Sequence, residues 1–204
     1  MPISGPPKSG NLAWHDSQLA ANERAELLGQ RGAVVWFTGL PASGKSTIAR
    51  DVEALLVRRG IHAYVLDGDN VRHGLNRDLG FSPADRQENV RRIGEVAKLF
   101  ADADIVALAA FISPYRRDRD AVRELIGPSF FEIHVATALE ACEARDPKGL
   151  YARARSGELE EFTGVSAPYE APENAELVLD TARLDREYCA RAVVELLKAA
   201  EIIR

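Results

Sequence analysis

The sequence contains one motif whose residue types and spacing are those of a phosphate-binding loop. Residues 39–47 read GLPASGKST, which fits the pattern GxxxxGK[ST]. In such a loop the glycines let backbone N–H groups turn toward a phosphate chain, and the lysine neutralises the β and γ oxygens. The pattern therefore predicts a nucleoside triphosphate held with Mg²⁺, although a tight glycine turn that merely starts a helix is the alternative. The residues expected to contact ATP are Gly39, Leu40, Pro41, Ala42, Ser43, Gly44, Lys45, Ser46 and Thr47.

Two carboxylates follow the next apolar segment. Asp67 and Asp69 flank a glycine, and in a parallel sheet they would lie beside the phosphate loop. Such groups can orient an attacking hydroxyl and hold water on Mg²⁺. Because a carboxylate is too weak a base to ionise an alcohol beforehand, we expect orientation, with the proton taken late. Ser46 and Asp69 are the predicted metal ligands, while capping of a helical turn is the alternative for the two aspartates.

Further polar residues follow these carboxylates. Arg86 and Asn89 are three positions apart, so they share a helix face and could both reach a ligand, whereas Arg91 and Arg92 point elsewhere. Ser113 precedes Pro114, which favours an extended Ser113, and its hydroxyl could cap the next helix or contact a substrate.

Alternating strand and helix patterns must position these groups. Short apolar segments predict five strands, at residues 33–38, 62–67, 104–111, 130–135 and 176–180. Helical patterns are found at residues 16–30 (capped by Asp16), 45–59, 82–103, 114–126, 137–145 and 184–203. This order predicts an α/β fold of the P-loop NTPase type, with a five-stranded parallel sheet and helices on both faces.

The chain is expected to form one domain. Its 204 residues suit a single domain at residues 11–204, and the proline- and glycine-rich residues 1–10 predict a flexible tail. Residues 146–174 are polar and interrupted by glycine and proline, so we predict a mobile lid there, with a helix near Tyr151. We call residues 146–174 the lid segment.

Composition excludes several function classes. The net charge of −5 gives no basic field for nucleic acid, and the longest apolar run, residues 105–112, is too short to span a bilayer. Cys142 and Cys189 lack metal-ligand spacing and are expected to be reduced thiols of a cytoplasmic protein. An Asn-Lys-x-Asp base-reading motif is absent from the sequence, so a kinase is favoured over a GTP switch.

Several strings together resemble the adenylyl-sulfate kinase family. They are DGDNVRHGLNRDLGF (67–81), DRQENVRR (85–92), FISPYR (111–116), DPKGLYARAR (146–155) and FTGVSAPYEAPE (162–173), in this order behind GLPASGKST. The resemblance implies transfer of the γ-phosphate of ATP to the 3'-hydroxyl of adenosine 5'-phosphosulfate, with Mg²⁺. A kinase for another small metabolite or nucleotide, or a nucleotide-binding module without turnover, are the alternatives.

The resemblance also implies residue roles. It places Asp69 at the acceptor hydroxyl, Phe81 and Phe162 on the two faces of the substrate adenine, and Lys148 on the lid. Lys45, Asp69 and Ser113 are the predicted catalytic residues, although direct in-line transfer needs no covalent step at Ser113. The predicted substrate-binding set is Asp67, Asp69, Arg72, Phe81, Arg86, Asn89, Ile112, Ser113, Lys148, Gly149, Leu150, Phe162 and Thr163.

Two positions depart from the family pattern. Ser166 stands where the family usually has Asp, which could alter lid closure or ATP contacts, and Pro41 stands where Ser is common. The resemblance further suggests a homodimer and an ATP sulfurylase partner.

Overall fold

A parallel sheet forms the centre of the computed structural model, which describes residues 11–13, 15, 17–20 and 22–204. Among these residues, five strands pair in the order β2-β3-β1-β4-β5. They are β1 (Ala33–Thr38), β2 (Ala63–Asp67), β3 (Val106–Ala110), β4 (Phe130–Val135) and β5 (Leu177–Leu179). Neighbouring strands are parallel, with Val35 of β1 aligned with Leu108 of β3 and with Phe131 of β4. The predicted fold class is confirmed, while the predicted tail at residues 1–10 lies outside the described residues.

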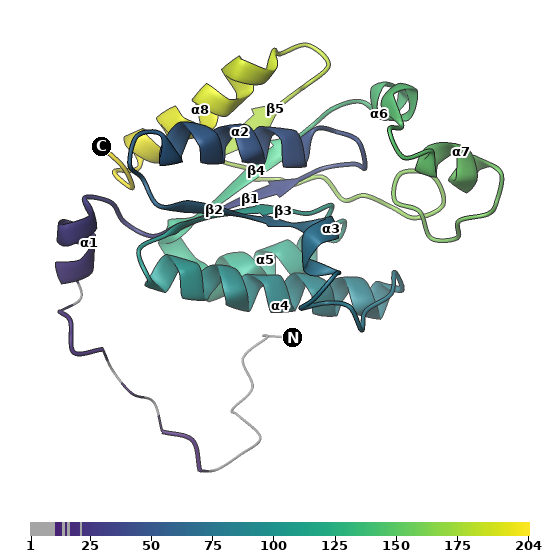
Figure 1. Ribbon diagram of the computed structural model, residues 1–204. Helices are drawn as coiled ribbons and strands as arrows, with labels where there is room; N and C mark the ends of the chain where they lie inside the picture. The colour runs from purple at the N-terminus through teal and green to yellow at the C-terminus, as the bar shows by residue number, and fades with distance from the viewer. Residues whose placement is uncertain (1–10, 14, 16, 21) are drawn as a thin grey trace.

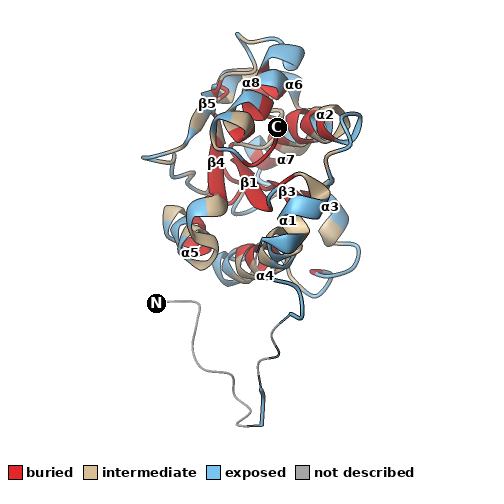
Figure 2. Cartoon of the chain, turned by 90° about the vertical axis from the view of Figure 1, so that its left-hand side faces the viewer, coloured by how far each residue is buried: buried red, intermediate tan, exposed pale blue. Residues whose placement is uncertain are grey.

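Helices cover both faces of the sheet. Helices α2 (Lys45–Val57) and α8 (Arg186–Ala199) pack on one face, and α4 (Pro83–Asp102) and α5 (Arg116–Ile126) on the other (Figure 1). Every residue of β1 and β3 is buried, which explains why both strands are apolar on both faces. Figure 2 shows the buried residues on the central strands and on the helix faces toward them.

The first helix is shorter than predicted. Helix α1 covers Glu23–Leu28 rather than residues 16–30, and the predicted cap Asp16 lies outside the described residues. Local side-chain bonds favour a turn before it: Ser17 Oγ accepts from the backbone N of Leu19, and a Glu23 carboxylate oxygen accepts from that of Ala20. Gly29, at φ +66°, ends the helix.

Other predicted elements are longer than the observed ones by a few residues. Strand β3 begins at Val106 rather than at residue 104, because Asp104 adopts φ +59° and its side chain accepts a hydrogen bond from the Gly32 backbone. Helix α8 ends at Ala199 rather than at residue 203. The turn after it, with Glu201 at φ +56°, returns Ile202 to the apolar core.

Three short helices lie near one end of the sheet, at the carboxyl ends of the strands. They are α3 (Gly68–Val71), α6 (Leu139–Arg145) and α7 (Leu150–Arg155) (Figure 1). A 3-10 turn, Gly127–Ser129, precedes β4. Helix α7 confirms the predicted helix within the lid segment, and a bridge between Thr163 and Ala167 closes a tight loop after it. Within the described residues no helix is long and apolar enough to cross a membrane.

Candidate functional site

A cavity of about 480 Å³ opens where β1, β2 and β3 end. Its walls come from the phosphate loop, α3, the start of α4, the residues after β3, and the α6–α7 region. The predicted site residues that line it are Pro41, Ala42, Gly44, Lys45, Ser46, Thr47, Asp67, Asp69, Arg72, Phe81, Arg86, Asn89, Ile112, Ser113, Lys148 and Leu150. The other predicted site residues are outside the lining that the structure describes: Gly39, Leu40, Ser43, Gly149, Phe162 and Thr163.

The phosphate loop adopts the backbone conformations that its glycines allow. Gly39 has φ +155° and Gly44 has φ +104°. A Cβ at Gly39 would lie 2.5 Å from the Val135 carbonyl oxygen, so a side chain there would clash with β4. The glycine spacing is thus a steric requirement of the loop and not only a turn signal.

Lys45 lies buried beneath the loop. Its Nζ donates to the carbonyl oxygens of Gly39 (2.9 Å) and Leu40 (2.7 Å). Burial lowers the pKa of Lys45 to about 8, and the negative charges of Asp67 and Asp69 only partly oppose that shift. Burial therefore makes the Lys45 ammonium easier to deprotonate than the ammonium of an exposed lysine.

Residues that the sequence analysis did not single out anchor the loop from behind. Ser43 O accepts hydrogen bonds from Thr137 Oγ1 (3.1 Å) and Thr181 Oγ1 (2.7 Å). Arg145, at the end of α6, donates to Thr181 O at 2.8 Å. Tyr151 in α7 donates to Pro41 O at 3.0 Å and is buried, so it is not part of a solvated helix face. Of these contacts, the one from Tyr151 joins the lid segment to the phosphate loop.

Asp67 and Asp69 take different positions. Asp67 caps α3 through a bond from the Asp69 backbone N to its Oδ1 (3.0 Å), so the capping alternative applies to Asp67. Asp67 is nevertheless in the cavity lining. The Asp69 carboxylate is exposed and pairs with the ammonium of Lys148 from the lid segment. This contact brings two predicted site residues together across the cavity mouth.

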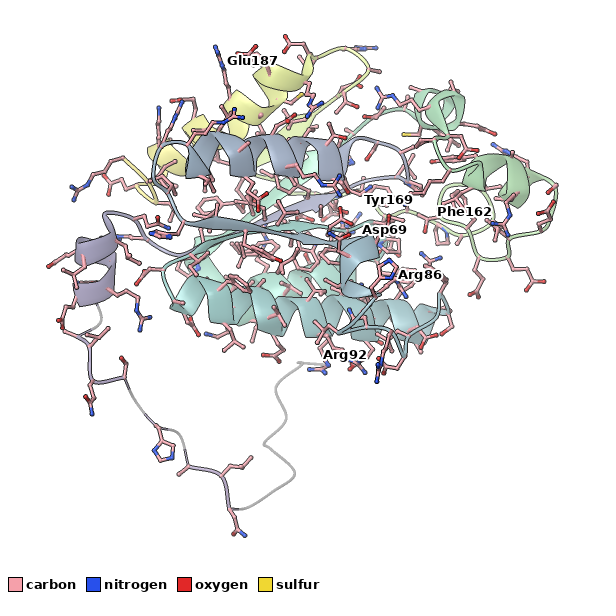
Figure 3. The ribbon with its side chains drawn as sticks, in the orientation of Figure 1. Asp69, Arg86, Arg92, Phe162, Tyr169 and Glu187 are labelled. Atoms are coloured by element: carbon pink, nitrogen blue, oxygen red, sulfur yellow. The ribbon has the colours of Figure 1, made fainter. Side chains whose placement is uncertain are left out.

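Arg86 joins the start of α4 to the lid segment. Its guanidinium donates to Phe81 O (2.8 Å), Thr163 Oγ1 (2.8 Å) and Glu161 O (2.6 Å). Arg72 lies with its Cζ 4.3 Å from the centre of the Phe81 ring, a cation–π contact. Figure 3 shows Asp69, Arg86 and Phe162 at the same end of the sheet.

The two predicted adenine-stacking rings are not equivalent. Phe81 lines the cavity and is 63% exposed, whereas Phe162 is half-buried with its ring packed edge-on against Tyr151, 5.0 Å between ring centres. The structure brings Phe81 but not Phe162 to the cavity lining.

Ser113 does not cap the following helix. Helix α5 has Tyr115 at its N-cap position, and Ser113 lies buried at φ +40° rather than extended as Pro114 suggested. Its Oγ accepts a hydrogen bond from Trp36 Nε1 at 3.0 Å and contacts the Phe111 carbonyl oxygen at 3.5 Å. The hydroxyl is therefore held by the protein itself at the edge of the cavity.

The two departures from the family pattern have local structural roles. Ser166 Oγ accepts from the backbone N of Phe162 at 3.0 Å, which closes the turn that Gly164 makes at φ +92°. Pro41 contributes its carbonyl oxygen to Tyr151. Neither residue provides a charged group to the cavity.

Comparison with known proteins identifies the family. A family model described as "Adenylylsulphate kinase" matches residues 31–180. The chain belongs to this family. The resemblance predicted from the sequence strings is thereby confirmed.

The relatives match over nearly their full length. An adenylyl-sulfate kinase of Shewanella amazonensis is 56% identical over 188 residues, covering 92% of this chain and 95% of the relative. One from Staphylococcus haemolyticus is 53% identical over 197 residues, covering 96% and 99%.

Solved structures agree with the sequence relatives. The Mycobacterium tuberculosis APS kinase CysC in complex with AMPPNP and APS is 50% identical, with a TM-score of 0.79 over 83% of this chain and 99% of that one. A hexameric APS kinase from Thiobacillus denitrificans is 35% identical, with a TM-score of 0.66 over 86% of this chain and 30% of that one. A gluconokinase from Sinorhizobium meliloti, at 17% identity and a TM-score of 0.55, shares the fold alone.

Proposed function

We propose that the chain transfers the γ-phosphoryl group of ATP to the 3'-hydroxyl of adenosine 5'-phosphosulfate, giving 3'-phosphoadenylyl sulfate and ADP in sulfate assimilation. One observation carries the proposal. A single cavity is lined on one side by the phosphate loop with Lys45, and on another by an exposed aromatic ring and two arginines. Such a cavity suits a triphosphate and an anionic purine nucleotide at the same time.

The donor side depends on Lys45 and the loop backbone. Backbone N–H groups of the loop and the N-terminus of α2 receive the phosphate chain. The Lys45 ammonium then exchanges its carbonyl partners for the β and γ oxygens and stabilises negative charge on the transferring group. Anion binding raises the pKa of Lys45 from its lowered value, so the bound nucleotide keeps the residue charged.

The residues present fit Mg²⁺ bound mainly by phosphate. Ser46 and Asp69 both line the cavity and offer the oxygen ligands that Mg²⁺ prefers. Within the described residues no group of three or more His, Cys, Asp or Glu gathers that could hold a metal ion by itself. Ser46 and Asp69 would help to hold the ion, which would supply positive charge against the negative charge that develops during the transfer.

Asp69 has the acceptor role in this proposal. The 3'-oxygen forms a bond to the γ-phosphorus as the bond to the β,γ-bridging oxygen breaks, and ADP leaves. The hydroxyl proton passes to the Asp69 carboxylate late in the transfer, because the transition state is loose. Asp69 is exposed, so it can exchange Lys148 for the ribose hydroxyl without loss of a buried contact.

Arginine and amide side chains would hold the phosphosulfate. Arg72, Arg86 and Asn89 all line the cavity, and guanidinium groups bind phosphate and sulfate oxygens in a bidentate manner. Phe81 supplies one stacking face for the adenine. Phe162 supplies the second face only if the lid segment moves, because its ring now packs on Tyr151. Ile112, Ser113, Gly149, Leu150 and Thr163 complete the proposed substrate contacts.

Ser113 has a supporting role in this scheme. Its Oγ is engaged by the Trp36 indole and lies near the Phe111 carbonyl oxygen, so neither neighbour can act as a base toward it. Direct transfer to the ribose hydroxyl needs no phosphoserine. We therefore propose that Ser113 shapes the cavity and is not phosphorylated during turnover.

An assay of product formation tests the proposal. The purified chain with ATP and Mg²⁺ is offered adenosine 5'-phosphosulfate, gluconate or a nucleoside monophosphate, and 3'-phosphoadenylyl sulfate is measured by chromatography. We expect turnover with the sulfated nucleotide, and a loss of roughly a hundredfold or more in kcat for Asp69→Asn. Equal turnover with gluconate would favour a sugar-acid kinase. A lack of turnover with every acceptor would favour a nucleotide-binding module.

Several finer expectations stay predictions. We propose that nucleotides order the lid segment, and unequal protease sensitivity of residues 146–174 with and without ligands would support this. A homodimer, a separate ATP sulfurylase partner and a cytoplasmic location are proposed from the family resemblance, while the net charge of −5 argues against nucleic acid as a partner.

A further inference from the structure

The acceptor side of the cavity has a strained rim. Ile112, Ser113 and Pro114 all line the cavity, and we call these three residues the rim. Ser113 adopts φ +40°, a region that residues with a side chain rarely occupy. A backbone in such a conformation persists only where its surroundings hold it.

Two buried side chains hold Ser113 from behind. Trp36 Nε1 donates to Ser113 Oγ at 3.0 Å, and Arg119 Nη1 donates to Ser113 O at 2.7 Å. Trp36 is fully buried between Phe111 and Phe130, and Arg119 is also fully buried. Neither side chain is among the cavity-lining residues that the structure describes. The conformation of the rim therefore depends on residues that a ligand would not touch.

Arg119 also reaches the last part of the lid segment, residues 170–174, which we call the return segment. Its Nη2 donates to Glu170 O at 2.8 Å, and the Glu170 backbone N donates to Pro114 O at 2.8 Å. The return segment is thus bonded directly to the rim. The Arg119 guanidinium therefore links the rim of the cavity to the return segment.

The charge of Arg119 is balanced within the core. Its Nε donates to Glu132 Oε1 of β4 at 2.6 Å, and both side chains are almost without solvent contact. A buried ion pair is weak support for stability, because an apolar pair can often replace it. A planar guanidinium has a second property: it presents donors in a fixed fork, which here reaches three different segments of the chain.

We propose that Arg119 is a positioning residue for the acceptor. It fixes the rim and the return segment together, and so determines the affinity for the sulfated nucleotide more than the affinity for ATP. The proposal rests on the proposed function, because that function assigns the rim to the acceptor. The phosphate loop is anchored mainly by other side chains, Thr137 and Thr181, and Arg119 has no described hydrogen bond to the loop.

The chain offers a matched control. Arg123, one turn further along α5, contacts the same Glu132 at 3.4 Å and also pairs with Glu176 at 2.6 Å. Among the described contacts it reaches neither Ser113 nor Glu170. Arg123→Met therefore disturbs the same ion-pair network without releasing the rim.

Steady-state kinetics with separate variation of the two substrates tests the proposal. For Arg119→Met we expect KM for adenosine 5'-phosphosulfate to rise roughly tenfold, the change that corresponds to loss of one strong hydrogen bond, with KM for ATP within about twofold. Arg119→Lys keeps the charge without the fork and should recover only part of the acceptor affinity. Trp36→Phe keeps a buried ring but removes the indole donor, so it should raise the same KM. Arg123→Met should change neither KM.

The outcomes separate this proposal from the proposed function. Absence of turnover by the wild-type chain would contradict the proposed function itself. An active wild type combined with an unchanged acceptor KM in folded Arg119→Met would overturn the positioning role alone, as would an equal rise of both KM values. If Arg119→Met does not fold, Arg119→Lys and Trp36→Phe decide, and unchanged acceptor KM in both overturns the proposal.

Discussion

Replacement of Lys45 by methionine should change how the free energy of unfolding depends on pH. Burial lowers the pKa of Lys45 in the folded chain to about 8 from an ordinary value of 10.5. Between these two values the folded state binds fewer protons than the unfolded state, so this residue makes the wild type more stable as pH rises. Below the lower value its buried charge is a constant penalty.

The size of the effect follows from the same two values. At about 1.4 kcal/mol for each pH unit, the full penalty is about 3 kcal/mol. Because methionine does not titrate, Lys45→Met should be favoured over the wild type at neutral pH. That relative advantage should shrink by about 2 to 3 kcal/mol between about pH 7 and about pH 10. The charge-assisted hydrogen bonds to Gly39 O and Leu40 O stabilise the charged wild-type lysine and oppose part of this advantage at neutral pH.

Denaturant unfolding followed by circular dichroism measures both proteins across this pH range. Lys148→Met is the matched control, because it removes a lysine of the same cavity whose side chain is 59% exposed. This control measures the pH dependence that results from replacing an exposed lysine of the cavity rather than the buried one. Parallel pH profiles for the wild type and Lys45→Met would refute the reasoning. Lys45→Met should also abolish turnover, so the residue that weakens the ligand-free fold is the one that the reaction needs.

Three further substitutions test the lid segment and the acceptor wall. Phe81→Ala should raise KM for the sulfated nucleotide by roughly tenfold through lost stacking, with KM for ATP as the internal control; equal effects on both would contradict the assignment. Gly164→Ala should lower stability by about 1 to 3 kcal/mol, because φ is +92° and the new Cβ would lie 2.9 Å from Leu40 Cδ2. Gly157→Ala is the control, because Gly157 has φ +81° and open space around it, so this variant measures the cost of the backbone conformation alone. Equal losses of stability in the two variants, measured by thermal unfolding, would exclude the Leu40 clash. Tyr151→Phe should cost about 1 kcal/mol by removing the bond to Pro41 O, and an unchanged melting temperature would argue against that bond.

The features predicted from sequence are those with a local pattern. The phosphate loop lies at residues 39–47 between a buried strand and a helix, and β1 and β4 begin and end where their apolar segments do. The helix predicted at residues 16–30 contains the apolar residues Leu19 and Leu27, yet both are exposed in the structure, and the observed α1 is shorter. Helix propensity alone did not extend α1, because short helices need packing of an apolar face against the core to be stable.

The contacts that sequence reasoning missed join residues far apart in the chain. Arg145 meets Thr181, and Trp36 meets Ser113, through side chains that have no spacing rule between them. Arg119 stands in the polar run RRDRD and has the pattern of a solvated helix face, yet it is fully buried. Only the packing of α5 against the sheet and the return segment shows which of these charges lies inside.

The position of Trp36 gives this kinase a built-in optical probe. The chain has two tryptophans, Trp14 and Trp36, so replacement of Trp14 by phenylalanine would leave one emitter. The remaining indole is buried and bonded to Ser113, at the edge of the cavity that we propose receives the acceptor. The wavelength and intensity of its fluorescence would therefore report on changes at that edge when nucleotide binds, without an attached label.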